Sequence, residues 1–73
     1  MFTIISRNNC VFCDKAKKAL QDLSLPYQEL NIEEERWLLD LVKRSGFKTV
    51  PQIYNQNGDH LGDYNQLAGF LNV

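Results

Sequence analysis

The only two cysteines of this 73-residue chain, Cys10 and Cys13, stand three positions apart, and their spacing limits how the fold can be stabilised. A chain this short buries a smaller fraction of its surface than a larger domain does, and many small domains compensate with disulfides or a structural metal. A bond across three positions closes a very small loop, so it removes little entropy from the unfolded chain. The fold must therefore depend on an apolar core, with which a hydrophobic content of 44% is compatible.

Charge and hydropathy exclude several classes of protein. Eight Lys and Arg stand against nine Asp and Glu, whereas nucleic-acid-binding proteins usually carry a basic excess. No apolar run approaches the roughly 18 residues of a membrane span, and residues 2–5 are too short for a signal-peptide core. We expect a single domain, residues 1–73, that is a cytoplasmic monomer and binds neither nucleic acid nor membrane. In the cytoplasm, a close cysteine pair indicates catalysis or metal binding.

Apolar periodicity in the first half predicts a strand, a helix and a second strand. Residues 2–5 are apolar and partly β-branched, as in a short buried strand. An amphipathic helix of about three turns should follow and end before Pro26. The residues expected on its apolar face are Phe12, Ala16, Ala19, Leu20 and Leu23. Residues 27–32 are predicted to form the second strand.

A second helix is predicted to begin directly after this strand. Asn31 would cap it, and the glutamates at 33–35 would fill its first turn. Lys43 and Arg44 in the last turn suit the helix dipole, and Gly46 is the expected C-cap. The residues expected to pack inward are Trp37, Leu38, Leu41, Val42 and Ser45.

The last third of the chain predicts a hairpin and a helix. Residues 52–54 and 60–61 are the expected strands, and Asn57-Gly58 between them is a strong hairpin signal. Residues 63–66 can cap a last helix. Its inward residues would be Leu67, Phe70 and Leu71. A right-handed crossover makes the first two strands parallel. The predicted fold class is therefore α/β, ordered β-α-β-α-β-β-α, with a four-stranded mixed sheet flanked by three helices.

The segment Cys10-Val11-Phe12-Cys13 lies where the first strand gives way to the first helix. Helical residues three apart are about 5–6 Å from each other, within the range of a disulfide. Cys10 at the helix N-terminus would face unpaired N–H groups and the positive end of the dipole, which favour the nucleophilic thiolate. Arg7 and Lys15 add positive charge nearby. We expect Cys10 to attack disulfides and the less exposed Cys13 to resolve the mixed disulfide.

Other interpretations of the pair stay open. Tetrahedral zinc needs four ligands, and the chain has one histidine, His60, and no second cysteine pair. An iron–sulfur cluster shared across a dimer and two incidental buried thiols are further alternatives. Redox chemistry is favoured because it alone uses the position at the helix N-terminus.

Three segments together resemble glutaredoxins: Cys10-Val11-Phe12-Cys13, Thr49-Val50-Pro51-Gln52-Ile53, and the Gly62…Tyr64…Leu67 segment. The resemblance covers essentially the whole chain in the family's order and spacing, and small bacteriophage glutaredoxins are especially similar. It implies a thioredoxin fold and glutathione-dependent thiol–disulfide exchange, with glutathione as co-substrate and no metal cofactor.

The resemblance also implies where the peptide backbone of glutathione would bind. Pro51 matches the family's cis-proline, although an ordinary loop proline before a strand is the alternative. Val50 would pair its backbone N–H and C=O with the cysteine of glutathione, as an added strand does. Arg7 and a basic residue near Thr49 would meet the glycyl carboxylate, with Lys48 as the candidate and Lys43 or Arg44 as alternatives. A solvated basic surface is the alternative for these basic side chains. Thr49 is itself among the implied binding residues.

By the same resemblance, the γ-glutamyl end of glutathione would meet the start of the last helix, an anion-binding position. The implied contacts are Gly62, Asp63, Tyr64 and Asn65, with Phe12 as an apolar wall. Tyr64 also suits a core position. The chain departs from the family in having Val11 for a proline, Asp63 for a glycine and Asn65 for an aspartate.

Two further functions are compatible with these residues. One is a glutaredoxin-like redoxin that donates electrons to ribonucleotide reductase and is recycled by thioredoxin reductase, which the segment around Cys10 also resembles. The other is an iron–sulfur cluster carrier at a dimer interface. The phenylalanine at 12, the threonine at 49 and the Gly62…Tyr64 arrangement favour a glutaredoxin that reduces protein disulfides or glutathione mixed disulfides.

Overall fold

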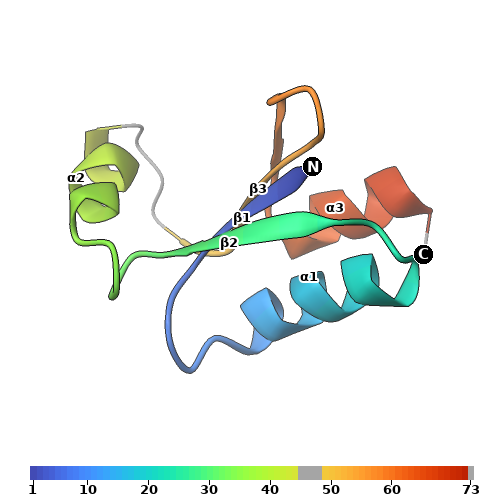
Figure 1. Ribbon diagram of the computed structural model, residues 1–73, viewed down its shortest axis with the longest axis horizontal. Coiled ribbons are helices and arrows are strands. Elements are labelled where there is room, and N and C mark those ends of the chain that lie inside the picture. The colour runs from blue at the N-terminus through green and yellow to red at the C-terminus, as the bar shows by residue number, and fades with distance from the viewer. Residues whose placement is uncertain (45–48, 73) are drawn as a thin grey trace.

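The computed structural model describes residues 1–44 and 49–72, and its elements follow the predicted order. They are β1 (Phe2–Ser6), α1 (Val11–Asp22), β2 (Tyr27–Asn31), α2 (Trp37–Arg44), β3 (Gln52–Tyr54), β4 (His60–Gly62) and α3 (Tyr64–Leu71). The strands form one sheet in the order β2-β1-β3-β4, with β1 and β2 parallel and the other neighbours antiparallel (Figure 1). The predicted mixed α/β architecture is confirmed. Within the described ranges, every helix falls short of the length and apolar character that crossing a bilayer requires.

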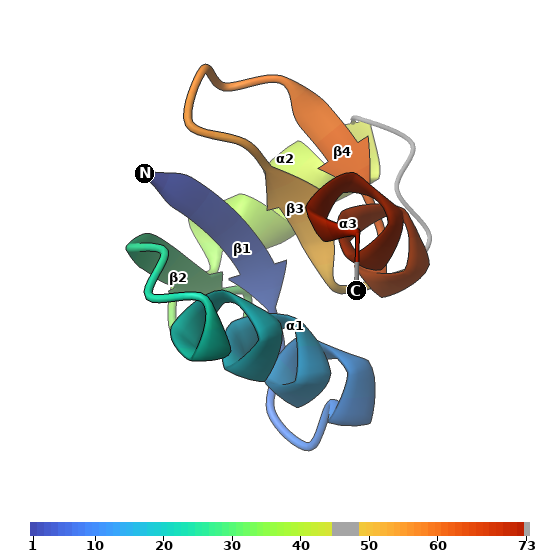
Figure 2. The ribbon, with the colours of Figure 1, turned by 90° about the vertical axis from the view of Figure 1, so that its right-hand side faces the viewer.

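Helices α1 and α3 lie side by side on one face of the sheet, and α2 lies apart from them beyond the carboxyl ends of β1 and β2 (Figures 1 and 2). Strand residues alternate between the two faces. Ile4 and Ile53, which are cross-strand partners, therefore share the face toward α1 and α3. The buried cluster between these layers consists of Phe2, Ile4, Ala16, Leu20, Ile53 and Leu67. This cluster is the apolar core that the short chain requires.

Helix α1 begins and ends close to the predicted positions, but its apolar face is shorter than predicted. Ala16 and Leu20 are buried, whereas Phe12 and Leu23 are 51% and 45% exposed. Leu23 is the C-cap residue, so it lies past the last turn that packs on the sheet. Phe12 lies in the first turn, where its ring stands 6.1 Å from that of Tyr64 at the start of α3.

The predicted start of the second helix is wrong. Asn31 is the last residue of β2, and its Oδ1 accepts the Glu33 N–H at 2.8 Å. The Asn31 carbonyl accepts the N–H groups of Glu34 and Glu35 at 3.2 and 2.8 Å. Asparagine thus closes a turn here, a geometry that its short side chain supports as readily as a helix cap. The three glutamates precede α2 instead of filling its first turn.

Helix α2 buries fewer residues than predicted. Leu38 and Val42 are buried, but Leu41 is 47% and Trp37 60% exposed. The Trp37 indole N–H donates to Glu35 Oε2 at 3.1 Å, which holds the ring at the surface. Trp37 is therefore not the packing residue that the pattern indicated. The predictions for Ser45 and Gly46 fall outside the described residues.

The hairpin and the last helix form where predicted. Gly58 adopts φ 85°, and Asn55 Oδ1 accepts the N–H groups of Asn57 and Asp59, each at 2.9 Å. Asp63 caps α3 by accepting the Gln66 N–H at 3.0 Å. The prediction that Phe70 points inward is wrong.

Of the residues expected inside α3, Leu67 is buried, Leu71 is partly buried against the core, and Phe70 is 53% exposed. Phe70 makes only an edge contact with the Phe2 ring, at 6.2 Å between centroids. Since Leu71, one residue further along α3, still packs against the core, Phe70 lies at the edge of the inward face of the helix and not on it.

Gly62 has a conformational reason to be glycine. It is buried and adopts φ 107°, which residues with a Cβ rarely adopt. A Cβ there would also collide with the Gln66 side-chain amide, whose Oε1 accepts the Asp63 N–H at 3.0 Å. Gly62 thus permits the reciprocal capping of α3 by Asp63 and Gln66.

Substitution of Gly62 tests this explanation. We expect Gly62→Ala to lower the free energy of unfolding by about 1–3 kcal/mol, because it adds backbone strain and displaces the Gln66 side chain. Gly69→Ala is the matched control, since no atom lies within 4 Å of a Cβ at this helical position. It should raise the free energy of unfolding by about 0.5–1 kcal/mol. Urea unfolding measures both, and equal stability of the two variants would contradict the explanation.

Candidate active site

Cys10 and Cys13 form a disulfide at the start of α1, with their Cα atoms 5.2 Å apart, as the spacing predicted. Cys10 is the N-cap residue of the helix, and its sulfur accepts the Cys13 backbone N–H at 3.1 Å. A sulfur atom therefore occupies the place that a serine or aspartate oxygen usually takes at a helix start. In the reduced form, this N–H and the helix dipole would stabilise a thiolate on Cys10.

The two cysteines differ more in position than in exposure. Cys13 is 1% exposed and Cys10 6%, so the ranking agrees with the prediction although both are buried. Only Cys10 stands at the cap, because Cys13 lies within the first helical turn. The two sulfur atoms therefore differ in their electrostatic surroundings rather than in solvent access, and this difference supports distinct chemical roles for Cys10 and Cys13.

The segment before β3 lies directly against the disulfide. The Val50–Pro51 peptide bond is cis, as expected for Pro51. The Val50 carbonyl oxygen lies 3.9 Å from the Cys10 sulfur, although the two residues are 40 positions apart. Since a disulfide sulfur carries no proton, this is a contact in the oxidised form. It places the Val50 carbonyl beside the Cys10 sulfur.

A groove of about 210 Å³ opens beside the disulfide. It is lined by Phe12, Thr49, Val50, Pro51, Asp63, Tyr64 and Asn65, all of which sequence analysis had assigned to ligand binding. Its walls come from the start of α1, the segment before β3 and the start of α3. Tyr64 lines this groove and also packs against the core, so the core position expected for it is confirmed, and its contact with a ligand stays a prediction. The Lys15 ammonium lies 5.1 Å from the centre of the Phe12 ring.

The remaining predicted binding residues lie elsewhere. Arg7 lines a neighbouring groove of about 460 Å³ together with Ile32, Leu39, Val42, Lys43, Thr49 and Val50. The two grooves share Thr49 and Val50, so they meet beside the disulfide. Gly62 directly precedes the groove residue Asp63 in the chain and permits the α3 cap. Lys48 lies outside the described residues.

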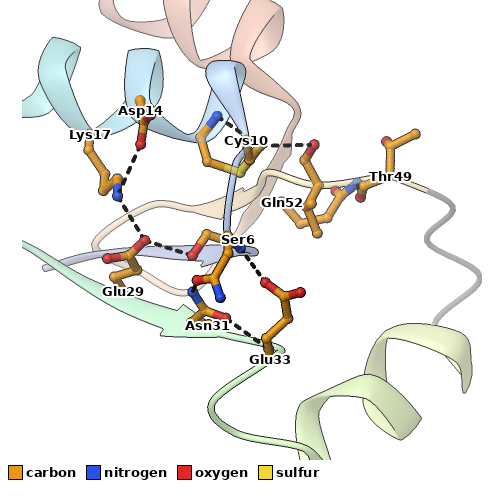
Figure 3. Close-up of a disulfide and its surroundings, with 12 residues drawn as sticks. Ser6, Cys10, Asp14, Lys17, Glu29, Asn31, Glu33, Thr49 and Gln52 are labelled. Carbon is orange, nitrogen blue, oxygen red and sulfur yellow. Dashed lines mark hydrogen bonds and ion pairs between the residues drawn. A yellow bond between two sulfur atoms is a disulfide. The ribbon is translucent and has the colours of Figure 1, made fainter.

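Sequence analysis missed the polar contacts that hold the loop before Cys10. The Asn8 backbone N–H donates to Glu33 Oε2 at 2.6 Å, and Asn31 Nδ2 donates to Asn8 Oδ1 at 2.9 Å (Figure 3). These bonds tie the loop to the turn after β2. Polar residues cluster after both strands in the sequence and could have indicated such contacts. The partners are 23 and 25 positions apart, so no local pattern pairs them.

A second polar group lies under the first turns of α1. Fully buried Ser6 donates from Oγ to Glu29 Oε2 at 2.7 Å, and Lys17 Nζ lies 3.0 Å from the same oxygen (Figure 3). Lys17 also lies 3.4 Å from Asp14. The Ser6 hydrogen bond, followed by that of Lys17, holds the pKa of Glu29 below its usual value. The Glu29 hydrogen bond raises the pKa of Lys17. The group thus connects α1 to β1 and β2.

The lowered pKa of Glu29 predicts a pH dependence of stability. Its contribution is fully present above the unfolded-state pKa near 4.5 and is lost as pH falls through the lower folded-state pKa. We expect Glu29→Gln to cost about 1 kcal/mol at pH 7 and to flatten the loss of stability below pH 4.5. Urea unfolding from pH 7 to pH 3 measures this. Glu34→Gln, in the exposed turn, is the control and should retain the wild-type pH profile.

A metal site needs several His, Cys, Asp or Glu side chains close together. In residues 1–44 and 49–72, no three of these side chains are grouped as metal ligands. An iron–sulfur cluster shared between two copies stays an untested alternative.

Comparisons with known proteins agree on one family. Residues 2–61 match the family model described as Glutaredoxin. The chain is 36% identical over 53 residues to the glutaredoxin-like protein NrdH of Lactococcus lactis subsp. cremoris, covering 73% of this chain and 74% of that protein. It is 31% identical over 75 residues to the glutaredoxin of Enterobacteria phage T4, covering 88% and 86%.

Solved structures give the same result. Reduced Escherichia coli glutaredoxin superposes with a TM-score of 0.78 at 30% identity, covering 97% of this chain and 92% of that one. A buckwheat glutaredoxin–glutathione complex superposes with a TM-score of 0.81 at 21% identity, covering 97% and 67%, and this likeness shows the fold alone. The predicted thioredoxin fold is confirmed.

Proposed function

Because the chain belongs to the glutaredoxin family, whose members are thiol–disulfide oxidoreductases, we propose that it reduces glutathione mixed disulfides and protein disulfides with electrons from glutathione. The observation that supports this most is the junction of the Cys10–Cys13 disulfide with the groove and with Val50. The Cys10 sulfur, the backbone of half-buried Val50 and the groove of about 210 Å³ adjoin one another there. We expect the protein to act as a cytoplasmic monomer.

The first step uses Cys10 of the reduced protein. Its thiolate attacks the glutathione sulfur of a mixed disulfide, which forms a Cys10–glutathione disulfide and releases the substrate thiolate. A second glutathione thiolate then attacks this bond. It releases oxidised glutathione and regenerates the Cys10 thiolate. The cycle therefore consumes one free glutathione, and the oxidised glutathione joins it to the glutathione that the substrate had carried.

Protein disulfides require Cys13 as well. After Cys10 has attacked the substrate, Cys13 attacks the mixed disulfide, releases the second substrate thiol and forms the Cys10–Cys13 bond. The oxidised structure is the product of this step. Two glutathione molecules would then reduce the bond in turn and complete the cycle.

In this proposal, the two grooves would hold the two ends of glutathione. Val50 would pair with the cysteinyl backbone, with Pro51 and Thr49 beside it and Phe12 as the apolar wall. The γ-glutamyl end would meet the start of α3, at Gly62, Asp63, Tyr64 and Asn65. The glycyl carboxylate would lie toward the second groove, where Arg7 and Lys43 supply positive charge, with Lys48 as a further candidate.

The Lactococcus relative supports a second candidate. Here thioredoxin reductase, instead of glutathione, would reduce the Cys10–Cys13 bond, and the electrons would pass to ribonucleotide reductase. The dithiol steps are the same in both proposals, so only the reductant and the protein target distinguish them.

A coupled assay with a model protein disulfide separates the two candidates. Glutathione with glutathione reductase and NADPH should support steady NADPH oxidation, whereas thioredoxin reductase with NADPH should not. Each reductase is run without this protein as a blank. Turnover with thioredoxin reductase alone would reject the glutathione proposal and favour the second candidate.

Cysteine variants test the assigned roles. We expect Cys10→Ser to lose activity on both substrate types, at least about 100-fold, because the proposed reaction of each substrate begins with attack by the Cys10 thiolate. Cys13→Ser should retain reduction of a glutathione mixed disulfide and lose reduction of a protein disulfide. The glutathione-coupled assay measures both activities. An inactive Cys13→Ser with an active Cys10→Ser would reverse the assignment.

A further inference from the structure

Gln52, the first residue of β3, is a buried polar side chain that the proposed mechanism does not use. Only 7% of it is exposed. Its Nε2 donates to the Thr49 carbonyl at 2.8 Å, and its Oε1 lies 2.7 Å from His60 Nε2 on β4. Gln52 therefore connects the edge strand β4 to the segment that borders the disulfide. Figure 3 shows Gln52 and Thr49 close to Cys10.

The Thr49 carbonyl determines which way the Gln52 amide faces, because a carbonyl oxygen can only accept and the amide nitrogen must therefore point toward it. Gln52 Oε1 is then the atom that faces His60. Since this oxygen can only accept, His60 Nε2 carries the hydrogen that joins them. The His60 ring is itself held by β4 and by the Tyr54 ring, whose centre is 5.1 Å away. The donor is thus oriented before any ligand arrives.

The Thr49 carbonyl and the Val50 N–H belong to one peptide unit. A trans peptide is planar, so its C=O and N–H point in opposite directions. Among the described residues only the Val50–Pro51 bond is cis, so the Thr49–Val50 bond is trans. Whatever holds the Thr49 carbonyl therefore also decides where the Val50 N–H points.

The two faces of the sheet define the sides toward which the Thr49 carbonyl and the Val50 N–H point. Ile53 faces the core beneath α1 and α3, and adjacent strand residues alternate, so Gln52 faces the opposite side. Its bond draws the Thr49 carbonyl toward that side. The Val50 N–H is then turned toward the side of α1 and α3, where the disulfide and the 210 Å³ groove lie.

We propose that Gln52 is a positioning residue that holds the Val50 N–H toward the groove, where it donates to the backbone carbonyl of the substrate cysteine. This rests on the proposed function, since the substrate is the cysteinyl backbone of glutathione or of a peptide. Gln52 does not touch the substrate. It acts through the Thr49–Val50 peptide and so affects substrate binding rather than sulfur chemistry.

Gln52→Met tests the proposal, because methionine has a similar length and no donor. The Michaelis constant for a glutathionylated peptide should rise about tenfold with kcat within twofold of wild type, as expected when a binding hydrogen bond is lost. The rate of Cys10 alkylation by iodoacetamide should not change. Gln52→Glu keeps the acceptor for His60 but loses the donor, and it should raise the Michaelis constant similarly.

Gln21→Met is the matched control. Gln21 donates to the Tyr27 hydroxyl at 2.8 Å on the exposed end of α1, so this variant loses a glutamine hydrogen bond away from the site. Its Michaelis constant should equal that of the wild type. Thermal unfolding of all variants establishes that they are folded. A folded Gln52→Met with an unchanged Michaelis constant would overturn the proposal.

A second measurement distinguishes a failure of the Gln52 proposal from a failure of the proposed function. Residual dipolar couplings of the Val50 N–H, from weakly aligned ¹⁵N-labelled protein, should change in Gln52→Met and not in Gln21→Met. If the wild type shows no turnover with glutathione, the proposed function fails and these couplings alone decide the role of Gln52. An unchanged Val50 coupling in Gln52→Met would overturn that role.

Discussion

The antiparallel pairing of β1 with β3 is the contact on which the whole site depends. Ile4 opposite Ile53 buries both side chains against α1 and α3, and this burial sets the register. The same register places Ile5 opposite Gln52. The carboxyl end of β1, which leads to Cys10, therefore lies beside the amino end of β3, which follows Pro51. A shift by one residue would turn Ile53 out of the core and separate Val50 from the disulfide.

Short-range polar contacts then shape each wall of the groove. The Cys10 sulfur caps α1, Asp63 and Gln66 cap α3 reciprocally, and Gln52 holds the segment between them. In the first of these, one sulfur is both the structural cap and the reactive atom. The helix start that Cys10 stabilises is thus also the source of the field that would favour its thiolate.

Local patterns predicted most elements because their caps and turns use residues close in sequence. Asn57-Gly58 and the Asp63…Gln66 box lie within one turn of what they stabilise, and both form as predicted. The start of α2 was wrong because Asn31 supports either a helix cap or a turn, and the choice depends on contacts of β2. The prediction that Trp37 packs inward was wrong because a periodic apolar pattern does not say how much sheet surface a helix covers.

The sequence by itself determined the order of elements, the cysteine pair at a helix start and the family to which these motifs point, because each depends on neighbours within a few positions. Only the tertiary structure decided which distant groups meet. Val50 reaches Cys10 across 40 positions, and Gln52, which donates to Thr49, also contacts His60 of the neighbouring strand β4. These contacts follow from strand register, which is set by burial of the whole core and cannot be predicted from any single segment.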